Sequence, residues 1–278
     1  MTVGFVVVTY NSEAVLAGCL ASVPHGLPIV VVDNASRDRS AEIAKFFGAQ
    51  VVSNPKNLGF GAACNQGVKC LSTSHVFFLN PDAILAKNAL AELEKAIERF
   101  PEAGGFGPAV KISGQTHSFR YKSYIQDQGS RYIQDSDAPC GYTEVDYIDG
   151  AALLCDRELF LNLGGFDESL FLYYEDDDLC YRMRLQNKAL IYVPQSVVIH
   201  KKKSSSGSEF RLHYLRAWHE TDSRIKLNRK YAIGLNTGKE TKRAAIRFVR
   251  SAMTLRLSKA ARYWGTLMAL KGRMEPRA

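Results

Sequence analysis

The chain has 278 residues, with 36 Lys and Arg against 28 Asp and Glu, and 46% apolar residues, enough for a sizeable core. The charge is unevenly spread: residues 201–278 hold 20 basic and five acidic residues, whereas residues 1–200 hold 16 basic and 23 acidic ones. This division argues against a uniformly basic nucleic-acid-binding protein.

Hydropathy and cysteine usage indicate a cytoplasmic protein. The longest apolar runs are strand-sized, well short of the roughly 20 residues that span a membrane. The N-terminus lacks a basic segment followed by a signal-type apolar stretch. The six cysteines form no Cys-x-x-Cys pair, so we expect buried reduced thiols rather than disulfides or a zinc site.

The first hundred residues alternate strand and helix signals. Continuous β-branched runs predict buried strands, and apolar residues at helical spacing predict helices between them. Such an alternation is typical of a parallel sheet covered on both faces. The predicted strands are 3–9, 29–33, 49–53 and 75–79, and the predicted helices are 12–22, 36–47, 61–71 and 86–100.

Residues 105–155 show shorter β-prone stretches between polar loops, which favour antiparallel strands, including one at 116–121. Further signals predict helices at 157–163 and 176–187, a strand at 190–199, and a basic loop at 201–208. Two helices are expected at 209–230 and 241–270. We therefore predict one α/β domain over 1–208 and a basic helical extension over 209–278.

Polar residues collect where the predicted parallel strands end. Thr9, Tyr10 and Asn11 end the first strand, Asp33 the second, and Asn80-Pro81-Asp82 follows the fourth. Ligands of such sheets bind beyond the carboxyl ends of the strands. Strand termination and helix capping are a simpler explanation for about half of these polar residues. They explain less well why Asp33 and Asp82 stand at strand ends.

The glycine-rich stretch at 57–65 lies before a helix, but it lacks the third glycine of a dinucleotide fingerprint. Its glycines favour either a close backbone approach to a phosphate or an ordinary turn. Asp82 suits Mg²⁺ or Mn²⁺, and His200 ends a core strand just before three lysines. A structural role for each remains the alternative.

Four consecutive carboxylates, at 175–178, open a predicted helix. One or two would stabilise the helix N-terminus, but four in a row repel one another, which favours proton or cation binding. A general base or a metal site is therefore expected. The alternating ligands and central glycine of an EF-hand are absent, and no nucleophile elbow indicates a hydrolase.

Taken together, residues 1–203 resemble the inverting glycosyltransferases of family 2, with the GT-A fold, and most closely their rhamnosyltransferase-like branch. In that branch Asn-Pro-Asp replaces the usual Asp-x-Asp metal motif. The resemblance rests on the order and spacing of Val-Val-Thr-Tyr-Asn (7–11), Val-Val-Asp-Asn-Ala-Ser (31–36), Asn-Leu-Gly-Phe-Gly-Ala-Ala-Cys-Asn (57–65), Leu-Asn-Pro-Asp (79–82), Asp-Gly-Ala (149–151), Gly-Gly-Phe-Asp-Glu (164–168), Tyr-Glu-Asp-Asp-Asp-Leu-Cys-Tyr-Arg (174–182) and Val-Pro (193–194) with His200.

The resemblance implies a role for each matching residue. Asp176 would be the general base, with Gly150, Glu175 and Asp178 supporting it or holding the acceptor. Asp82 and His200 would bind Mg²⁺ or Mn²⁺. Asp33 would read the nucleobase. The remaining donor-binding positions implied are Thr9, Tyr10, Asn11, Asn57, Gly59, Gly61, Asn65, Asn80 and Lys203.

The resemblance further implies a hexosyltransferase of cell-surface polysaccharide synthesis that moves L-rhamnose from dTDP-rhamnose to a glycan or lipid-linked acceptor. A single displacement would invert the anomeric carbon without an enzyme nucleophile. Two alternatives stay open: a UDP-hexose donor, and a catalytically silent nucleotide- or membrane-binding protein. The sequence leaves the oligomeric state open.

The predicted helix at 241–270 places apolar residues near one face and basic residues largely elsewhere. Such a helix is typical of a membrane-surface or partner-binding element, so peripheral contact with the inner face of the cell membrane is expected. The alternative is packing on the domain with a solvated basic face. Nucleic-acid binding through this tail is not expected. The apolar positions are Ile246, Val249, Met253, Leu257, Trp264 and Leu267.

Overall fold

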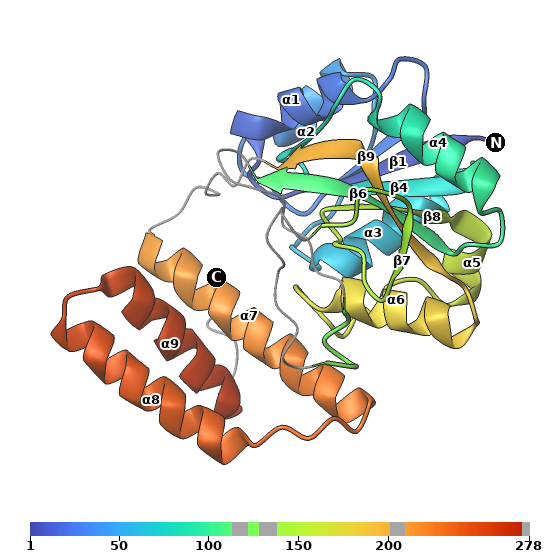
Figure 1. The fold of residues 1–278 in the computed structure, drawn as a ribbon. Helices are drawn as coiled ribbons and strands as arrows, with labels where there is room; N and C mark the ends of the chain where they lie inside the picture. Colours follow the sequence, from blue (N-terminus) through green and yellow to red (C-terminus); the bar gives the residue numbers. More distant parts are fainter. Residues whose placement is uncertain (113–121, 128–137, 201–208, 274–278) are drawn as a thin grey trace. The chain divides into compact units, whose positions relative to one another are not determined.

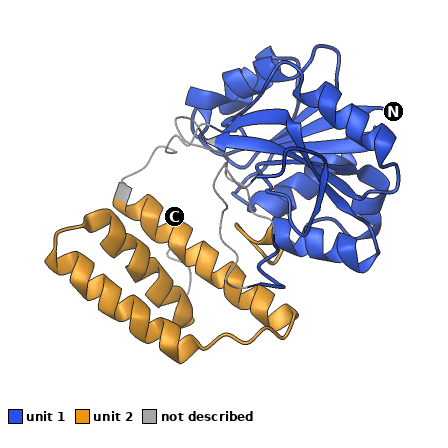
Figure 2. Cartoon of the chain, in the orientation of Figure 1, with its two compact units in different colours: residues 1–167, 176–205 blue, residues 168–175, 206–278 orange. Residues whose placement is uncertain are grey.

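A computed structural model describes residues 1–112, 122–127, 138–200 and 209–273. The chain divides into two compact units (Figure 2). Unit 1 comprises residues 1–167 and 176–205, and unit 2 comprises residues 168–175 and 206–278. The expected strand at 116–121 and the basic loop at 201–208 lie outside the described residues.

Unit 1 begins with the predicted alternation of strands and helices (Figure 1). Each strand pairs in parallel with its neighbour in the order β3-β2-β1-β4. The elements in chain order are β1 (Val3–Thr9), α1 (Glu13–Ser22), β2 (Ile29–Asp33), α2 (Ser40–Phe46), β3 (Gln50–Ser53), α3 (Phe60–Lys69) and β4 (His75–Leu79).

The sheet continues beyond β4 with mixed pairing. β8 pairs antiparallel with both β4 and β6, whereas β6 and β9 are parallel. The nine strands of the described residues thus form one sheet, parallel in its first half and mixed in its second. The remaining elements of unit 1 are β5 (Ala83–Leu85), α4 (Ala89–Arg99), β6 (Gly105–Ile112), β7 (Thr143–Val145), β8 (Ala152–Asp156), α5 (Arg157–Asn162), α6 (Glu175–Leu185, whose first residue belongs to unit 2) and β9 (Leu190–His200).

Two hydrophobic clusters pack on opposite faces of the sheet. Neighbouring residues of β1 belong to different clusters. Phe5 belongs to the cluster that includes α1, α2 and α4, and Val6 belongs to the cluster that includes α3, α5 and α6. Burial on both faces explains why the strands read as continuous apolar runs rather than alternating ones. The α/β class predicted from the sequence is confirmed.

Two expected elements differ from the structure. The helix predicted at 86–100 begins at Ala89, after a turn in which the Ala89 amide donates to the Ala86 carbonyl, and residues 83–85 before it form β5 against β9. The single helix predicted at 241–270 is wrong. The chain forms two helices there, with Leu255 in the left-handed region (φ 51°) between them.

Unit 2 consists of α7 (Glu209–Lys230), α8 (Thr237–Met253) and α9 (Leu257–Leu270) with the segment 168–175. Gly265 of α9 lies against the Tyr214 carbonyl of α7, a contact that leaves no room for a Cβ atom. The Phe171 ring stacks on His219 at 4.3 Å, and Ser223 Oγ donates to the Leu172 carbonyl at 2.9 Å. These contacts account for the place of 168–175 in this unit.

Candidate active site

The first predicted site residues lie at the carboxyl ends of β1 and β2. Thr9 and Asp33 are paired in register, and the Asn34 amide donates to the Thr9 carbonyl at 2.9 Å. The Thr9 side chain is buried, and no described residue hydrogen-bonds its hydroxyl. A buried hydroxyl without a partner is uncommon in proteins, so Thr9 Oγ1 is available to a ligand. Tyr10, the next residue, is largely exposed.

Turn geometry fixes the segments that follow these two strands. Asn11 adopts a left-handed conformation (φ 52°), and its Oδ1 accepts a hydrogen bond from the Arg37 amide at 2.8 Å. One carboxylate oxygen of Asp33 accepts from the Ser36 amide at 3.2 Å. The two strand ends are thereby tied together at the edge of the sheet where parallel-sheet ligands bind.

The glycine-rich segment joins the same edge. The Asn34 side chain donates to the Gly59 carbonyl at 3.0 Å, and Asn57 Oδ1 accepts from the Gly59 amide at 2.9 Å. Gly59 has φ 90°, a conformation that disfavours any side chain. Gly61 is buried at the start of α3. Asn57, Gly59 and Gly61 therefore form a shaped turn beside the ends of β1 and β2.

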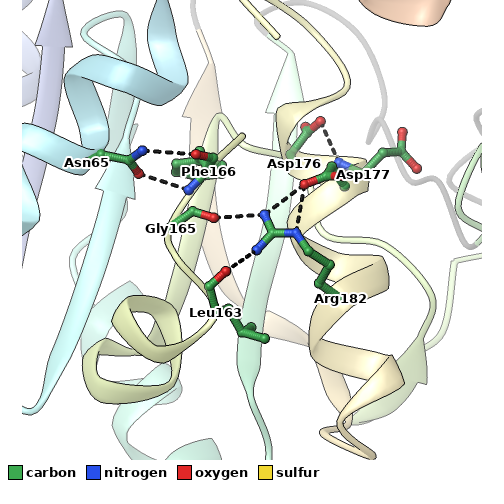
Figure 3. Close-up of polar contacts among 8 residues, drawn as sticks. Asn65, Leu163, Gly165, Phe166, Asp176, Asp177 and Arg182 are labelled. Atoms are coloured by element: carbon green, nitrogen blue, oxygen red, sulfur yellow. Dashed lines mark hydrogen bonds and ion pairs between the residues drawn. The ribbon is translucent and has the colours of Figure 1, made fainter. Parts of the chain in front are cut away.

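Asn65 has a structural function in the described contacts. Its amide donates to the Phe166 carbonyl at 2.9 Å, and its oxygen accepts from the Phe166 amide at 2.8 Å (Figure 3). This two-way pairing joins α3 to the turn after α5. The donor-binding role assigned to Asn65 stays a prediction, and Lys203 lies outside the described residues.

Strand register brings Asp82 and His200 together. Ala83 of β5 pairs with His200 of β9, and the Asp82 carboxylate lies 2.9 Å from His200 Nε2. Both side chains are about four-fifths buried. Asn80 lies two residues before Asp82, and its backbone amide donates to the Ala151 carbonyl at 2.9 Å. In the described part of the chain, no group of three or more His, Cys, Asp and Glu gathers as a metal site.

Asp176 is held by the loop between β7 and β8. Its Oδ2 accepts hydrogen bonds from the Tyr147 hydroxyl at 2.6 Å and from the Gly150 amide at 2.9 Å. A Cβ atom at position 150 would lie only 3.2 Å from Asp176, so glycine permits this close approach. Gly150 precedes Ala151, which bonds Asn80. One short segment thus connects the carboxylate of Asp176 with the end of β4.

The four carboxylates at 175–178 do not form one site. Asp177 accepts from Ser123 Oγ and the Tyr124 amide, and Asp178 forms an ion pair with Arg182 at 2.7 Å. Glu175, Asp177 and Asp178 are buried, and only Asp176 is partly open to solvent. Successive helical positions point in different directions, so the expected mutual repulsion is replaced by separate partners.

Arg182 connects Asp178 to the turn that precedes unit 2. Its guanidinium donates to the Leu163 carbonyl at 2.9 Å and to the Gly165 carbonyl at 2.7 Å (Figure 3). Gly165 in turn leaves no space for a side chain beside Asn65. Asp178 therefore has a structural function in α6, and its predicted contact with an acceptor stays a prediction.

Sequence reasoning missed Tyr147 and Arg182. The spacing of Asp178 and Arg182, four residues apart on a helix, is a signal for their pairing. Tyr147 lies 29 residues before Asp176, and no local pattern links them.

All six cysteines are free; four are buried, and Cys70 and Cys140 are exposed. Burial raises the pKa of the Cys19 thiol far above its usual value, so Cys19 stays protonated within α1 and cannot serve as a thiolate nucleophile.

The mixed sheet, with polar residues at the ends of β1, β2 and β4, has the GT-A arrangement. Solved structures confirm the fold: S. aureus TarS 1–349 in complex with UDP-GlcNAc has a TM-score of 0.59 at 15% identity, covering 98% of this chain and 93% of that one. A mannosyltransferase from Pyrobaculum calidifontis, in complex with GDP-Man and Mn²⁺, has a TM-score of 0.58 at 17% identity, with coverages of 98% and 88%.

The sequence profile of Glycosyl transferase family 2 matches residues 5–164, so the chain belongs to this family. It is 26% identical to the N-acetylglucosaminyl-diphospho-decaprenol L-rhamnosyltransferase of Mycobacterium tuberculosis, covering 78% of this chain and 81% of that one. A pre-mycofactocin glycosyltransferase of the same organism is 29% identical, with coverages of 64% and 38%. The protein is therefore a glycosyltransferase that uses a nucleotide sugar. No described helix is long and apolar enough to cross a membrane.

Proposed function

We propose that the protein transfers L-rhamnose from dTDP-rhamnose to a lipid-linked or glycan acceptor, with inversion at the anomeric carbon. The observation that carries the catalytic assignment is the position of Asp176. It is the one carboxylate of the 175–178 cluster that is partly open to solvent, and Tyr147 and Gly150 fix its orientation. The rhamnosyltransferase relative supports the choice of L-rhamnose as the transferred sugar and of a diphospho-lipid acceptor.

The chain's residues suggest how the displacement proceeds. The Asp176 carboxylate accepts the proton of the acceptor hydroxyl as that oxygen attacks the anomeric carbon. Its other contacts hold it in place, so little reorientation is needed during the reaction. Thr9, Asp33 and the turn at 57–61 bind the nucleotide at the edge of the sheet. The nucleoside diphosphate leaves on the opposite face of the sugar.

Asp82 and His200 fit a divalent cation as a partial ligand set. A carboxylate and an imidazole converge at one point, and a diphosphate with water would complete the coordination. The imidazole nitrogen suits Mn²⁺ better than Mg²⁺, which prefers oxygen ligands. When bound, such a cation neutralises the charge that develops on the departing diphosphate.

A donor screen tests the choice of sugar. We expect purified protein to bind dTDP more tightly than UDP or GDP, and to consume dTDP-rhamnose faster than UDP-hexoses, when isothermal titration and donor turnover are measured. Comparing dTDP with UDP reports recognition of the nucleoside alone, because neither carries the sugar that is transferred. A strong preference for UDP would show that a UDP-hexose is the donor, and binding without any turnover would favour the catalytically silent alternative.

We also propose peripheral membrane contact through α8. Ala244 and Ser251 of this helix are buried, whereas Ile246, Val249 and Met253 are 45%, 53% and 79% exposed. The exposed three follow a helical i, i+3, i+7 spacing and form an apolar stripe, with exposed Arg250 beside it. Basic residues beside an exposed apolar stripe suit an anionic lipid surface. Leu267, expected on this face, is instead buried in α9.

The apolar stripe can be tested by vesicle co-sedimentation. Replacing Ile246, Val249 and Met253 together by serine should lower partitioning onto phosphatidylglycerol vesicles at least about tenfold, because each loses apolar area that lipid would cover. Phe46→Ser, at an exposed position of unit 1, is the matched control and should sediment like the wild type. Unchanged sedimentation of the triple variant would reject membrane contact through α8.

A further inference from the structure

The helices of unit 2 line a polar, half-open cavity of about 330 Å³, in which Arg243, Arg247 and Arg262 are exposed to solvent. Residues of α7, α8 and α9 all line it, and the hydrophobic core clusters of unit 1 have no part in it. The family relationship assigns no function to this cavity. Its charged lining residues are Arg224, Arg243, Arg247, Arg262, Glu220 and Glu240.

The two glutamates do not balance the four arginines. Glu240 is shared, at 3.4 Å from Arg224 and 3.3 Å from Arg243. Glu220 lies 3.7 Å from Arg262, a distance at the long end of an ion pair. Guanidinium groups that share one carboxylate repel one another, and an anion placed among them lowers that repulsion.

Arg247 is the fourth guanidinium of the cavity, and it has no carboxylate partner among the described residues. Its guanidinium carbon lies 5.8 Å from the centre of the Tyr263 ring of α9. Stacking on an aromatic ring orients a guanidinium without neutralising its charge, and leaves its N–H groups free to donate. Arg247 is therefore held in place with donors available for an anion.

Neutral donors and rigid packing complete the cavity. Thr221 of α7 is buried and Thr266 of α9 is partly buried, and both line the cavity. Their hydroxyls can donate to anionic oxygens. The close contact of Gly265 with the Tyr214 carbonyl holds α9 against α7 next to these residues. The two helices that carry these hydroxyls are thus packed together before any ligand binds, which reduces the ordering cost of binding.

We propose that this cavity, the arginine pocket of unit 2, binds a phosphate or diphosphate group. Arginine forks match phosphate oxygens in pairs, and an excess of guanidinium over carboxylate selects anions over neutral ligands. The proposal that the pocket binds phosphate does not depend on the proposed function. Only the identity of the molecule that carries the phosphate rests on it. A diphospho-lipid acceptor would present a diphosphate, and an anionic phospholipid would present a phosphate of the same chemistry.

Isothermal titration of the full chain with inorganic pyrophosphate in EDTA tests the pocket directly. Chelation removes metal-dependent binding at the donor site, so the remaining binding reports on the arginines. We expect Arg247→Gln to weaken pyrophosphate binding about tenfold or more. Arg229→Gln, the same change at an exposed position of α7 outside the cavity, should leave binding unchanged. Equal affinities of the two variants, or no binding by the wild type, would overturn the proposal.

Vesicle sedimentation then distinguishes the source of the phosphate. If the pocket holds a phospholipid headgroup, Arg247→Gln should reduce binding to phosphatidylglycerol vesicles more than Arg229→Gln does. If it holds the acceptor's diphosphate, the two variants should sediment alike while only Arg247→Gln weakens pyrophosphate binding. Neither measurement uses sugar transfer, so a wrong donor or acceptor assignment would leave the result on the pocket standing.

Discussion

Asp176→Asn should lower the turnover number by about 10²–10⁴-fold while leaving donor affinity near the wild-type value, because it removes the general base and little else. The asparagine oxygen can still accept from the Tyr147 hydroxyl and the Gly150 amide, so the loop between β7 and β8 keeps its anchor. A neutral amide oxygen is too weak a base to take the acceptor proton. Single-turnover rates and donor dissociation constants, measured separately, report the two effects.

Asp177→Asn is the matched control for this prediction. It makes the same change one position along α6, in a buried carboxylate that accepts from Ser123 Oγ and the Tyr124 amide. An amide oxygen can accept both bonds, so turnover should stay within a few-fold of the wild type. Near-normal turnover of Asp176→Asn, or an equal loss in both variants, would reject Asp176 as the base.

The sequence predicted the parallel half of the sheet because its strands are buried on both faces. The runs at 3–9 and 29–33 are almost continuously apolar, and such runs between segments of helical periodicity are typical of strands covered on both sides. β5 was missed because three residues are too few to show any period. The break between α8 and α9 was missed because Leu255, a residue without turn preference, takes the left-handed conformation.

In the candidate site, too, the sequence predicts positions that local motifs mark and misses contacts between residues far apart in the chain. The sequence places Asp33 at the end of a strand, Asp82 just after one and Asp176 at the start of a helix, and the structure has them there. Their roles come from the family resemblance and stay predictions. The partners that orient Asp176 were not found together: Gly150 was assigned only a supporting position, and Tyr147 was absent. Their contact depends on how the loop between β7 and β8 packs against α6, which no short sequence pattern encodes.

Removing the metal should stop sugar transfer. Because Asp82 and His200 lie in contact, we expect these two residues to determine how much Mn²⁺ the enzyme needs for turnover. Excess EDTA should abolish turnover, and added Mn²⁺ should restore it. His200→Gln should raise the Mn²⁺ concentration for half-maximal turnover about tenfold or more, because it removes a proposed ligand, and loss of a residue that only supports a ligand already costs roughly 10–100-fold in affinity. Asp82→Ala should have a larger effect, since it removes the only carboxylate of the pair.

His75→Gln provides the comparison, because His75 lies at the start of β4 and Asp82 lies beyond its end. This variant removes a partly buried imidazole from the same strand without touching the proposed ligand set, so its metal requirement should match the wild type. Loss of the free Mn²⁺ signal in electron paramagnetic resonance gives a readout that is independent of activity. Full turnover in EDTA would rule out a metal-dependent reaction. Wild-type Mn²⁺ binding by both Asp82→Ala and His200→Gln would place the cation elsewhere.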